Sequence, residues 1–215
     1  MKIQILISNN SWANNYKYYI KKKLSQYTKK ILFLKDHKDI KKNYDINIIF
    51  SYFKKIEKKQ LKLSKYNLIL HESDLPNGRG MSPISWQILQ GKKNIVFSLI
   101  DASEKIDAGK IYYKKKVKFN GTELFEDIKK SQLINNLKLL EKFIRNLIKH
   151  NKPPKSKKQK GRPTYYSLRS SSDSELKINK SIKSQMNLMR ICDFNNYPAF
   201  FYYNKKKFLI KLSKK

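Results

Sequence analysis

Short apolar segments alternate with polar ones along the first part of the chain. Lys2–Ser8 carries apolar side chains at alternate positions, which is the pattern of a β-strand. Lys30–Leu34, Ile46–Phe50 and Asn67–Leu70 are short, apolar and rich in β-branched residues, so we expect each to form a strand. Tyr16–Tyr27 has apolar residues at helical spacing. Strands separated by helices or loops in this way predict an open, mostly parallel, twisted α/β sheet with helices on both faces.

The middle of the chain continues with a loop, a short helix, two strands and a long helix. We expect the loop over Glu72–Gly80 and the short helix to follow it as far as Leu89. Asn94–Ile100 and Lys110–Phe119 have the composition of strands. The long helix is expected over Thr122–His150, because its apolar residues form one stripe at helical spacing: Leu133, Leu137, Leu140, Phe143, Ile144 and Leu147.

A proline-rich segment ends the long helix and marks a boundary. Residues 151–163 contain three prolines, and proline lacks an amide hydrogen and clashes with the preceding helical turn. We therefore predict a core over residues 1–150, a linker over 151–163 and a C-terminal extension over 164–215. Within the extension we expect a helix at Lys180–Cys192, followed by an aromatic β-hairpin that turns at Asn204 and Lys205.

Composition adds a large positive charge to this picture. The 215 residues include 49 Lys and Arg against 16 Asp and Glu, and the net charge of +33 by itself indicates a nucleic-acid or anionic-membrane partner. Only five of these cations are arginine, the residue favoured at sites that grip phosphate or bases. The lysines occur in pairs and triplets along the whole chain, which favours compositional drift. The two longest lysine-free segments, Tyr66–Gly91 and Ser184–Asn204, then indicate where the chain is not free to vary.

Several classes of protein are excluded by composition. The single cysteine, Cys192, forms no intramolecular disulfide and anchors no thiolate-rich zinc site, and three scattered histidines add little, so we expect no metal. Hydrophobic residues make up 40% of the chain, which is enough for a buried core. No stretch approaches the roughly 18 apolar residues of a membrane span, and the N-terminus lacks the long apolar region of a signal peptide. We expect a cytoplasmic protein without a membrane partner.

Two residues with catalytic chemistry follow neighbouring strands. His71 ends the strand that begins at Asn67, and ligands of open α/β sheets bind beyond the carboxyl ends of strands. Asp107 follows the strand Asn94–Ile100, and Gly109 permits a tight turn there. A histidine and a carboxylate on neighbouring loops form a candidate base and the group that orients it.

A longer motif surrounds these two residues. The pattern H-x-S-x-L-P-x-x-R-G-x-x-P is followed, without gaps, by a tryptophan, a glycine and D-x-G. It resembles the catalytic core of the folate-dependent formyltransferases, a family that includes methionyl-tRNA formyltransferase and the amino-sugar N-formyltransferases. The residues that carry the resemblance are His71, Ser73, Leu75, Pro76, Arg79, Gly80, Pro83, Trp86, Gly91, Asp107 and Gly109.

The resemblance implies a Rossmann-type core that transfers a formyl group from 10-formyltetrahydrofolate to a primary amine through a tetrahedral intermediate. His71 would take the amine's proton or donate to the oxyanion, and Asp107 would hold the imidazole in its tautomer. Ser73 and Gly109 would support the oxyanion or the loop. The resemblance also implies cofactor contacts from Tyr52, Phe53, Leu75, Pro76, Gly78, Arg79 and Gly80, and acceptor contacts from Arg190 and Tyr197.

One position departs from the family pattern. The family has N-x-H, with an asparagine two residues before the histidine, and this chain has Ile69 there. Isoleucine donates no hydrogen bond, and loss of one oxyanion donor costs about a hundred- to a thousandfold in rate. Asn67 lies on the same strand face but about 6–7 Å further back. Ser73 or a backbone amide of the loop is therefore the expected replacement.

Members of this family differ in the amine that accepts the formyl group. Methionyl-tRNA formyltransferases carry an additional barrel domain that helps to bind tRNA, whereas one helix and one hairpin are expected after Lys160 here. We therefore expect a small acceptor, a nucleotide-linked amino sugar for a surface polysaccharide. The alternatives are an enzyme acting on charged initiator tRNA and a catalytically impaired RNA-binding homologue. The apolar residues near the C-terminus also favour a homodimer.

Overall fold

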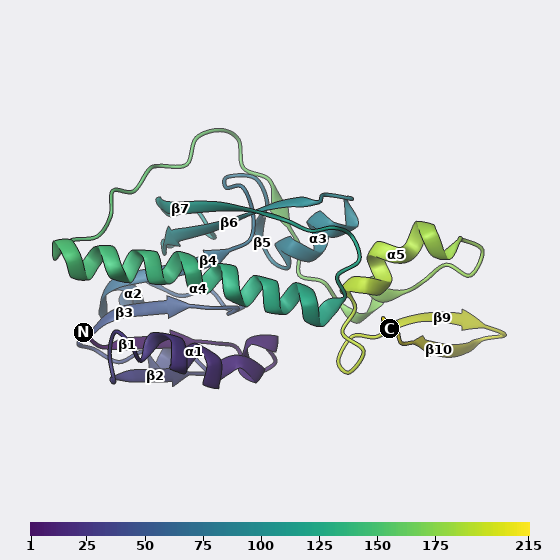
Figure 1. Cartoon of the computed structure of the whole chain (residues 1–215), viewed down its shortest axis with the longest axis horizontal. Coiled ribbons are helices and arrows are strands. Elements are labelled where there is room, and N and C mark those ends of the chain that lie inside the picture. The colour runs from purple at the N-terminus through teal and green to yellow at the C-terminus, as the bar shows by residue number, and fades with distance from the viewer.

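A six-stranded sheet forms the centre of the protein, and the computed structural model describes all 215 residues (Figure 1). The first four strands in spatial order run parallel, and β6 is antiparallel to both of its neighbours. The predicted mostly parallel α/β sheet is therefore confirmed. In spatial order the strands are β2 (Ile31–Leu34), β1 (Ile3–Leu6), β3 (Tyr44–Ile49), β4 (Ser64–His71), β6 (Asn94–Asp101) and β7 (Ile111–Lys118).

The reversed direction of β6 has a simple cause. Two adjacent strands can run parallel only if the connection between them crosses back over the length of the sheet, which usually takes a helix of that length. Between β4 and β6 the chain has the two-residue strand β5 (Arg79–Gly80) and the seven-residue helix α3 (Pro83–Leu89). The chain does not cross back over the sheet in this connection and re-enters it at the edge where β4 ended, so β6 runs antiparallel to β4.

The two faces of the sheet are covered unequally. Alternate residues of the strands, such as Ile3 and Ile5, bury one face under α1 (Lys17–Leu24), α3 and α4 (Phe125–His150) in a core of 25 buried residues. The 3-10 helix η1 (Trp12–Tyr16) packs against the same core. The other face holds six buried residues under short elements, α2 (Lys58–Leu61) and the 3-10 helix η2 (His37–Asp39).

Helix α4 is the longest element and runs across the sheet (Figure 1). It ends at His150, as the sequence predicts, and Asn151 closes it in a left-handed conformation with a φ of 49°. Asn is tolerated in that region because its short polar side chain interacts with the local backbone. No helix of the protein combines the length and the apolar character that a membrane crossing requires.

The segment after α4 packs against the core. Lys157 pairs with Ile111 through two backbone hydrogen bonds of 2.8 and 2.9 Å. The short strand β8 (Tyr165–Tyr166) then pairs in parallel with β5. The predicted linker therefore lies against the start of β7, and the first residues of the extension lie against the loop that follows His71.

The rest of the extension forms the expected helix and hairpin at one end of the molecule (Figure 1). After the 3-10 helix η3 (Ser171–Ser174) come α5 (Ile182–Ile191), β9 (Ala199–Tyr203) and β10 (Lys206–Ile210). The two residues between the last strands, Asn204 and Lys205, both have positive φ, which confirms the predicted two-residue turn.

Candidate active site

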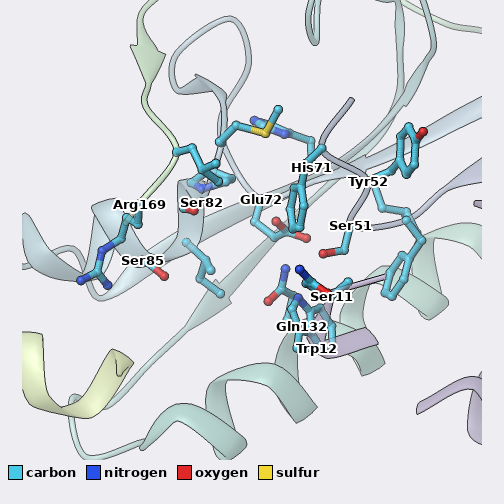
Figure 2. Close-up of a pocket in the computed structure, with 18 of the residues that line it drawn as sticks. Ser11, Trp12, Ser51, Tyr52, His71, Glu72, Ser82, Ser85, Gln132 and Arg169 are labelled. Atoms are coloured by element: carbon cyan, nitrogen blue, oxygen red, sulfur yellow. The ribbon is translucent and has the colours of Figure 1, made fainter. Parts of the chain in front are cut away.

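A cavity of about 1210 Å³ opens at the edge of the sheet where β1, β3 and β4 end. Residues that follow each of these strands line it, among them Asn9, Ser51 and Glu72. Figure 2 shows His71 and Glu72 between Ser51 and Tyr52 on one side and Ser82, Ser85 and Arg169 on the other. Single small-molecule pockets have volumes of about 300–1,000 Å³. The cavity therefore has room for more than one ligand.

His71 occupies the carboxyl end of β4 and is buried except for 5% of its surface. Its Nε2 lies 2.8 Å from the carbonyl oxygen of Gly78. Its Nδ1 lies 3.5 Å from Oδ2 of Asp107. The structure thus brings together the histidine and the carboxylate that the sequence places on neighbouring loops.

Both ring nitrogens of His71 face acceptors. A carbonyl oxygen accepts hydrogen bonds and cannot donate them, so Nε2 carries a hydrogen. Nδ1 faces the carboxylate of Asp107 at 3.5 Å. The two contacts hold the ring in one orientation, and each ring nitrogen faces a group of the protein.

Asp107 is fixed by its backbone as well as by its carboxylate. It adopts a left-handed conformation with a φ of 47°. The amide of Gly80 donates to its Oδ2 at 2.8 Å, and the side-chain amide of Gln159 donates to the carbonyl oxygens of Asp107 and Gly109 at 2.7 and 2.9 Å. Gly109 is required because any Cβ there would overlap the carbonyl oxygen of Asp101. The turn therefore presents one orientation of the carboxylate to His71.

An aromatic wall borders the cavity on the side of β3. Tyr52 and Phe53 both line it, and the hydroxyl of Tyr52 is fixed by the amide and Nδ1 of His37 at 3.0 and 2.7 Å. Ile56 and Ile69 extend the same wall. Flat, largely apolar walls suit planar ring systems. The residues present therefore fit a heterocycle such as the pterin of a folate.

Comparison with known proteins identifies the family. The formyl transferase family matches residues 7–144, which run from the end of β1 into α4 and include His71 and Asp107. The chain belongs to the formyl transferase family. A curated relative, the methionyl-tRNA formyltransferase of Thermodesulfovibrio yellowstonii, is 29% identical over 162 residues, which cover 73% of this chain. The match covers 52% of that relative, so the chain spans about half of its length.

Solved structures of formyl transferases and of HypX share the fold. The methionyl-tRNA formyltransferase of Clostridium thermocellum superimposes with a TM-score of 0.76 at 22% identity, over 96% of this chain and 90% of that one. A 4-N formyltransferase of Francisella tularensis gives 0.72 at 19% identity, over 100% and 98%. HypX of Aquifex aeolicus, solved in complex with tetrahydrofolic acid, gives 0.74 at 16% identity, over 97% and 37%. At these identities the likeness establishes the fold alone.

Some residues of the family motif support the loop from outside the cavity. Of the expected cofactor contacts, Tyr52, Phe53 and Gly80 line the cavity. Arg79 instead donates from its guanidinium to Gln159 at 2.7 and 3.2 Å and more weakly to the hydroxyl of Tyr165 at 3.4 Å. The structure does not bring the remaining expected contacts to the cavity wall: Leu75, Pro76, Gly78 and Arg79.

The residues expected to support the oxyanion or the loop, Ser73 and Gly109, both lie outside the cavity lining. Ile69 lines the cavity at the asparagine position. Ser73 is almost fully buried, its hydroxyl has no hydrogen-bond partner, and it lies outside the lining. Gly109 also lies outside the lining and acts on the turn of Asp107. In this arrangement the Ser73 hydroxyl does not reach the cavity, because its side chain lies under Gly78.

Of the two residues expected to contact the acceptor, one lines the cavity and the other does not. Tyr197 lines the cavity and is half exposed. Arg190 is buried and donates to the carbonyl and carboxylate oxygens of Glu123 at 2.9 and 3.2 Å and to Asn187 at 3.0 Å. Arg190 therefore attaches α5 to the loop that precedes α4 and does not face the cavity.

Sequence analysis missed Glu72, which lies on the opposite wall from Tyr52. Only 6% of its surface is exposed, and its Oε1 accepts a hydrogen bond of 2.7 Å from the side-chain amide of Asn136 on α4. A signal was present, since a carboxylate directly follows the strand-end histidine inside a lysine-free segment. The family motif does not specify the residue at this position, so the motif does not predict a role for Glu72.

Lys129 is the second missed residue and comes from α4. Its ammonium donates to Oε1 of Gln132 at 3.1 Å and lies 5.0 Å from the ring centre of Trp12. Burial lowers its pKa to about 8, although Glu72 and other nearby carboxylates act in the opposite direction. Lys129, Gln132 and Asn136 share one helix face and interrupt the apolar stripe where α4 meets the cavity.

The charge of the cavity differs from that of the whole chain. Its lining contains four cationic and five acidic residues, in a chain whose net charge is +33. The lysines therefore do not gather at the cavity. No group of three or more His, Cys, Asp or Glu side chains is arranged to hold a metal ion. The lining charges are Lys54, Lys55, Lys129 and Arg169 against Glu72, Glu104, Asp107, Glu126 and Asp193.

Proposed function

We propose that the protein transfers a formyl group from 10-formyltetrahydrofolate to a primary amine, and that the amine belongs to a nucleotide-linked amino sugar. One observation carries the proposal. In a chain of the formyl transferase family, His71 and Asp107 lie 3.5 Å apart on the wall of a large cavity at the carboxyl edge of the sheet. This is the edge at which α/β folds bind their substrates.

The folate donor is supported by the family and by the aromatic wall. When bound, 10-formyltetrahydrofolate supplies the formyl group and an amine leaving group. Tyr52 and Phe53 would hold its ring system, and the backbone near Gly80 would border it. The complex of HypX with tetrahydrofolic acid supports folate binding by this fold.

The chain's own residues supply charge stabilisation and orientation. His71 lies at the cavity wall, where negative charge develops on a formyl oxygen under attack, and in its protonated form it would stabilise that charge. Asp107 would balance the charge of the protonated ring and fixes the ring, as carboxylates do in other histidine sites. Ile69 contributes no donor beside His71, so this chain relies on His71 more than a homologue with asparagine does.

An amino-sugar acceptor is supported by the charge and the volume of the cavity. A lining with five carboxylates suits an acceptor that arrives as an ammonium ion. Arg169 and Lys129 offer positive charge for a phosphate at the same time. The fold of the Francisella tularensis 4-N formyltransferase matches this chain over its full length, so the likeness includes the helix and hairpin of the extension.

Charged initiator tRNA is the second candidate acceptor. The sequence relative from Thermodesulfovibrio yellowstonii is a methionyl-tRNA formyltransferase, and a chain with a charge of +33 attracts nucleic acid. Against it stands the lining of the cavity, where cations do not outnumber carboxylates.

The experiment offers purified protein 10-formyltetrahydrofolate together with a panel of nucleotide-linked amino sugars or with charged initiator tRNA. We expect release of tetrahydrofolate with an amino sugar, and a loss of at least a hundredfold in kcat for His71→Ala, since acid–base and charged groups contribute about 10²–10⁴-fold. Turnover with tRNA alone would support the second candidate. No turnover with any amine, together with salt-sensitive RNA binding, would instead identify an RNA-binding homologue.

A further inference from the structure

Glu72 has one oxygen engaged and one oxygen open. Its Oε1 is held by Asn136 at 2.7 Å, and its backbone carbonyl accepts from Gln87 at 2.6 Å, so the side chain and the main chain are both fixed. Oε2 accepts no hydrogen bond and is not sealed inside the protein. An open carboxylate oxygen on a side chain that is more than nine-tenths buried therefore faces the cavity.

No lysine or arginine lies within ion-pairing distance of this carboxylate. Lys129 comes from the same wall, but its ammonium is directed to Gln132 and to the face of Trp12. A buried carboxylate without a counter-ion is costly, and a cationic ligand that pairs with it recovers part of that cost.

The other acidic and basic groups next to the site are already engaged. Both nitrogens of His71 face groups of the protein, so neither is directed at a substrate in this arrangement. Asp107 has the imidazole beside it and an amide hydrogen bond from Gly80. Glu72 is therefore the carboxylate beside His71 that has both an open oxygen and no ion-pair partner.

We infer that Glu72 binds the ammonium group of the acceptor and takes from it the proton that blocks attack. An ammonium nitrogen has no lone pair. When one of its N–H bonds breaks, the electron pair stays on nitrogen, the proton moves to the Glu72 carboxylate, and the neutral amine becomes a nucleophile. The carboxylic acid returns its proton to water after turnover. This assignment rests on the proposed function and gives the ammonium a binding group that His71 does not supply.

Several charged groups line the cavity together with Glu72. His71 and Asp107 lie on the sheet side, Lys129 and Glu126 on α4, and Arg169 and Asp193 on the extension. Of these, burial lowers the pKa of Lys129 to about 8, so its charge fades in the mildly alkaline range. At pH 7 Lys129 is therefore mostly charged.

Binding tests the assignment without any turnover. The affinity of the tetrahydrofolate-loaded protein is measured by calorimetry at pH 7 for matched pairs of ligands: UDP-glucosamine with UDP-glucose, and a dTDP-linked 4-amino sugar with its 4-hydroxy counterpart. We expect the wild type to prefer one amine over its alcohol by about tenfold or more, and Glu72→Gln to lose that preference, because an ion pair with a desolvated carboxylate is removed. Glutamine keeps an oxygen for Asn136, so the fold is retained. A wild type that does not distinguish amine from alcohol, or a variant that still does, overturns the assignment.

Turnover supplies a second, independent result. With the preferred amine, kcat/KM of Glu72→Gln should fall about a hundredfold at pH 7 and recover toward the wild type as pH rises and the free amine becomes abundant. Glu57→Gln, which removes an exposed carboxylate outside the cavity lining, is the matched control and should lose less than threefold. An equal loss in both variants, or a loss in Glu72→Gln that does not change with pH, contradicts proton uptake by Glu72. Amine-selective binding without formyl transfer would refute the proposed function and leave the ammonium site standing.

Discussion

Lys129 differs from the other lysines through its position on the cavity wall. Burial lowers its pKa to about 8, so about a tenth of its amine is uncharged at pH 7, against fewer than about one in a thousand for a lysine of ordinary pKa. We predict that Lys129 reacts ten- to a hundredfold faster than the exposed Lys130 with limiting acetic anhydride at pH 7. Peptide mass spectrometry measures both rates in one sample, and equal labelling of the two would contradict the lowered pKa.

The motif residues show how far single positions can be predicted from sequence. His71 and Asp107 lie together as expected, because two strand ends fixed by a motif leave little freedom for their side chains. Arg79 and Ser73 belong to the same motif, yet they face Gln159 and the underside of Gly78. A motif specifies which residues a loop needs and does not say which of them touch a ligand. Glu72 was missed for the converse reason, since its importance comes from Asn136 on a distant helix.

At the level of elements, the returning segment after α4 holds the catalytic turn in place. Gln159 connects its own segment to two other parts of the site. Its side chain accepts a hydrogen bond from Arg79, after β4, and donates to the carbonyl oxygens of Asp107 and Gly109, after β6. A left-handed conformation at Asp107 is unfavourable without such support. The segment predicted as a linker is therefore part of the active-site scaffold.

We predict that Gln159→Ala lowers kcat for formyl transfer about ten- to a hundredfold, because small displacements of a catalytic group have effects of this size. The melting temperature should change by only a few degrees. Gln185→Ala is the matched control, since Gln185 also donates to two carbonyl oxygens, those of Lys177 and Lys180, but far along the extension. Stopped-flow turnover and thermal unfolding of both variants check the prediction. Equal losses of activity in the two variants would show that Gln159 has no special relation to Asp107.

Elements with strong internal periodicity were predictable, and those defined by a distant partner were not. Helix α4 and the β9–β10 hairpin follow from an apolar stripe and from a turn between aromatic strands. The pairing of β5 with β8 is two residues long and depends on the path of the chain around the core, so no local pattern announces it. The direction of β6 depends in the same way on the path of its connection.

At the scale of the whole molecule, the positive charge and the cavity are separate features. A charge of +33 surrounds a cavity whose lining is nearly neutral. Compositional drift toward lysine would leave the fold intact on the outer surface, because an exposed lysine changes the free energy of folding little. Residues that line the cavity would be constrained by the need to bind a ligand. The lysine-free segment Tyr66–Gly91 supports this separation, since it contains both His71 and Glu72.

The C-terminal hairpin leads to the last prediction, a homodimer. One side of the hairpin packs with α5 around Leu176, Met189 and Ala199. Its outer residues remain open, with Tyr202 at 51% and Leu209 at 54% exposure. A two-stranded sheet is marginally stable when apolar surface of this kind is left in water, and a second copy of the same hairpin offers a complementary cover. Solution scattering should therefore give a mass of about twice the 25.7 kDa of one chain.

Two substitutions on one face of the hairpin test the dimer. Tyr202 and Leu209 lie on the same face, because Tyr202 pairs with Lys207 and Leu209 pairs with Phe200. The double variant Tyr202→Lys, Leu209→Lys should give a folded monomer, since both side chains are exposed in the single chain and their replacement leaves its core untouched. Ile148→Lys is the control: it places a charge on an equally exposed apolar residue near the end of α4, away from the hairpin (Figure 1), and should leave the dimer intact. A wild-type chain of monomeric mass would remove the basis for the dimer, and a dimer that survives the double variant would place its interface elsewhere.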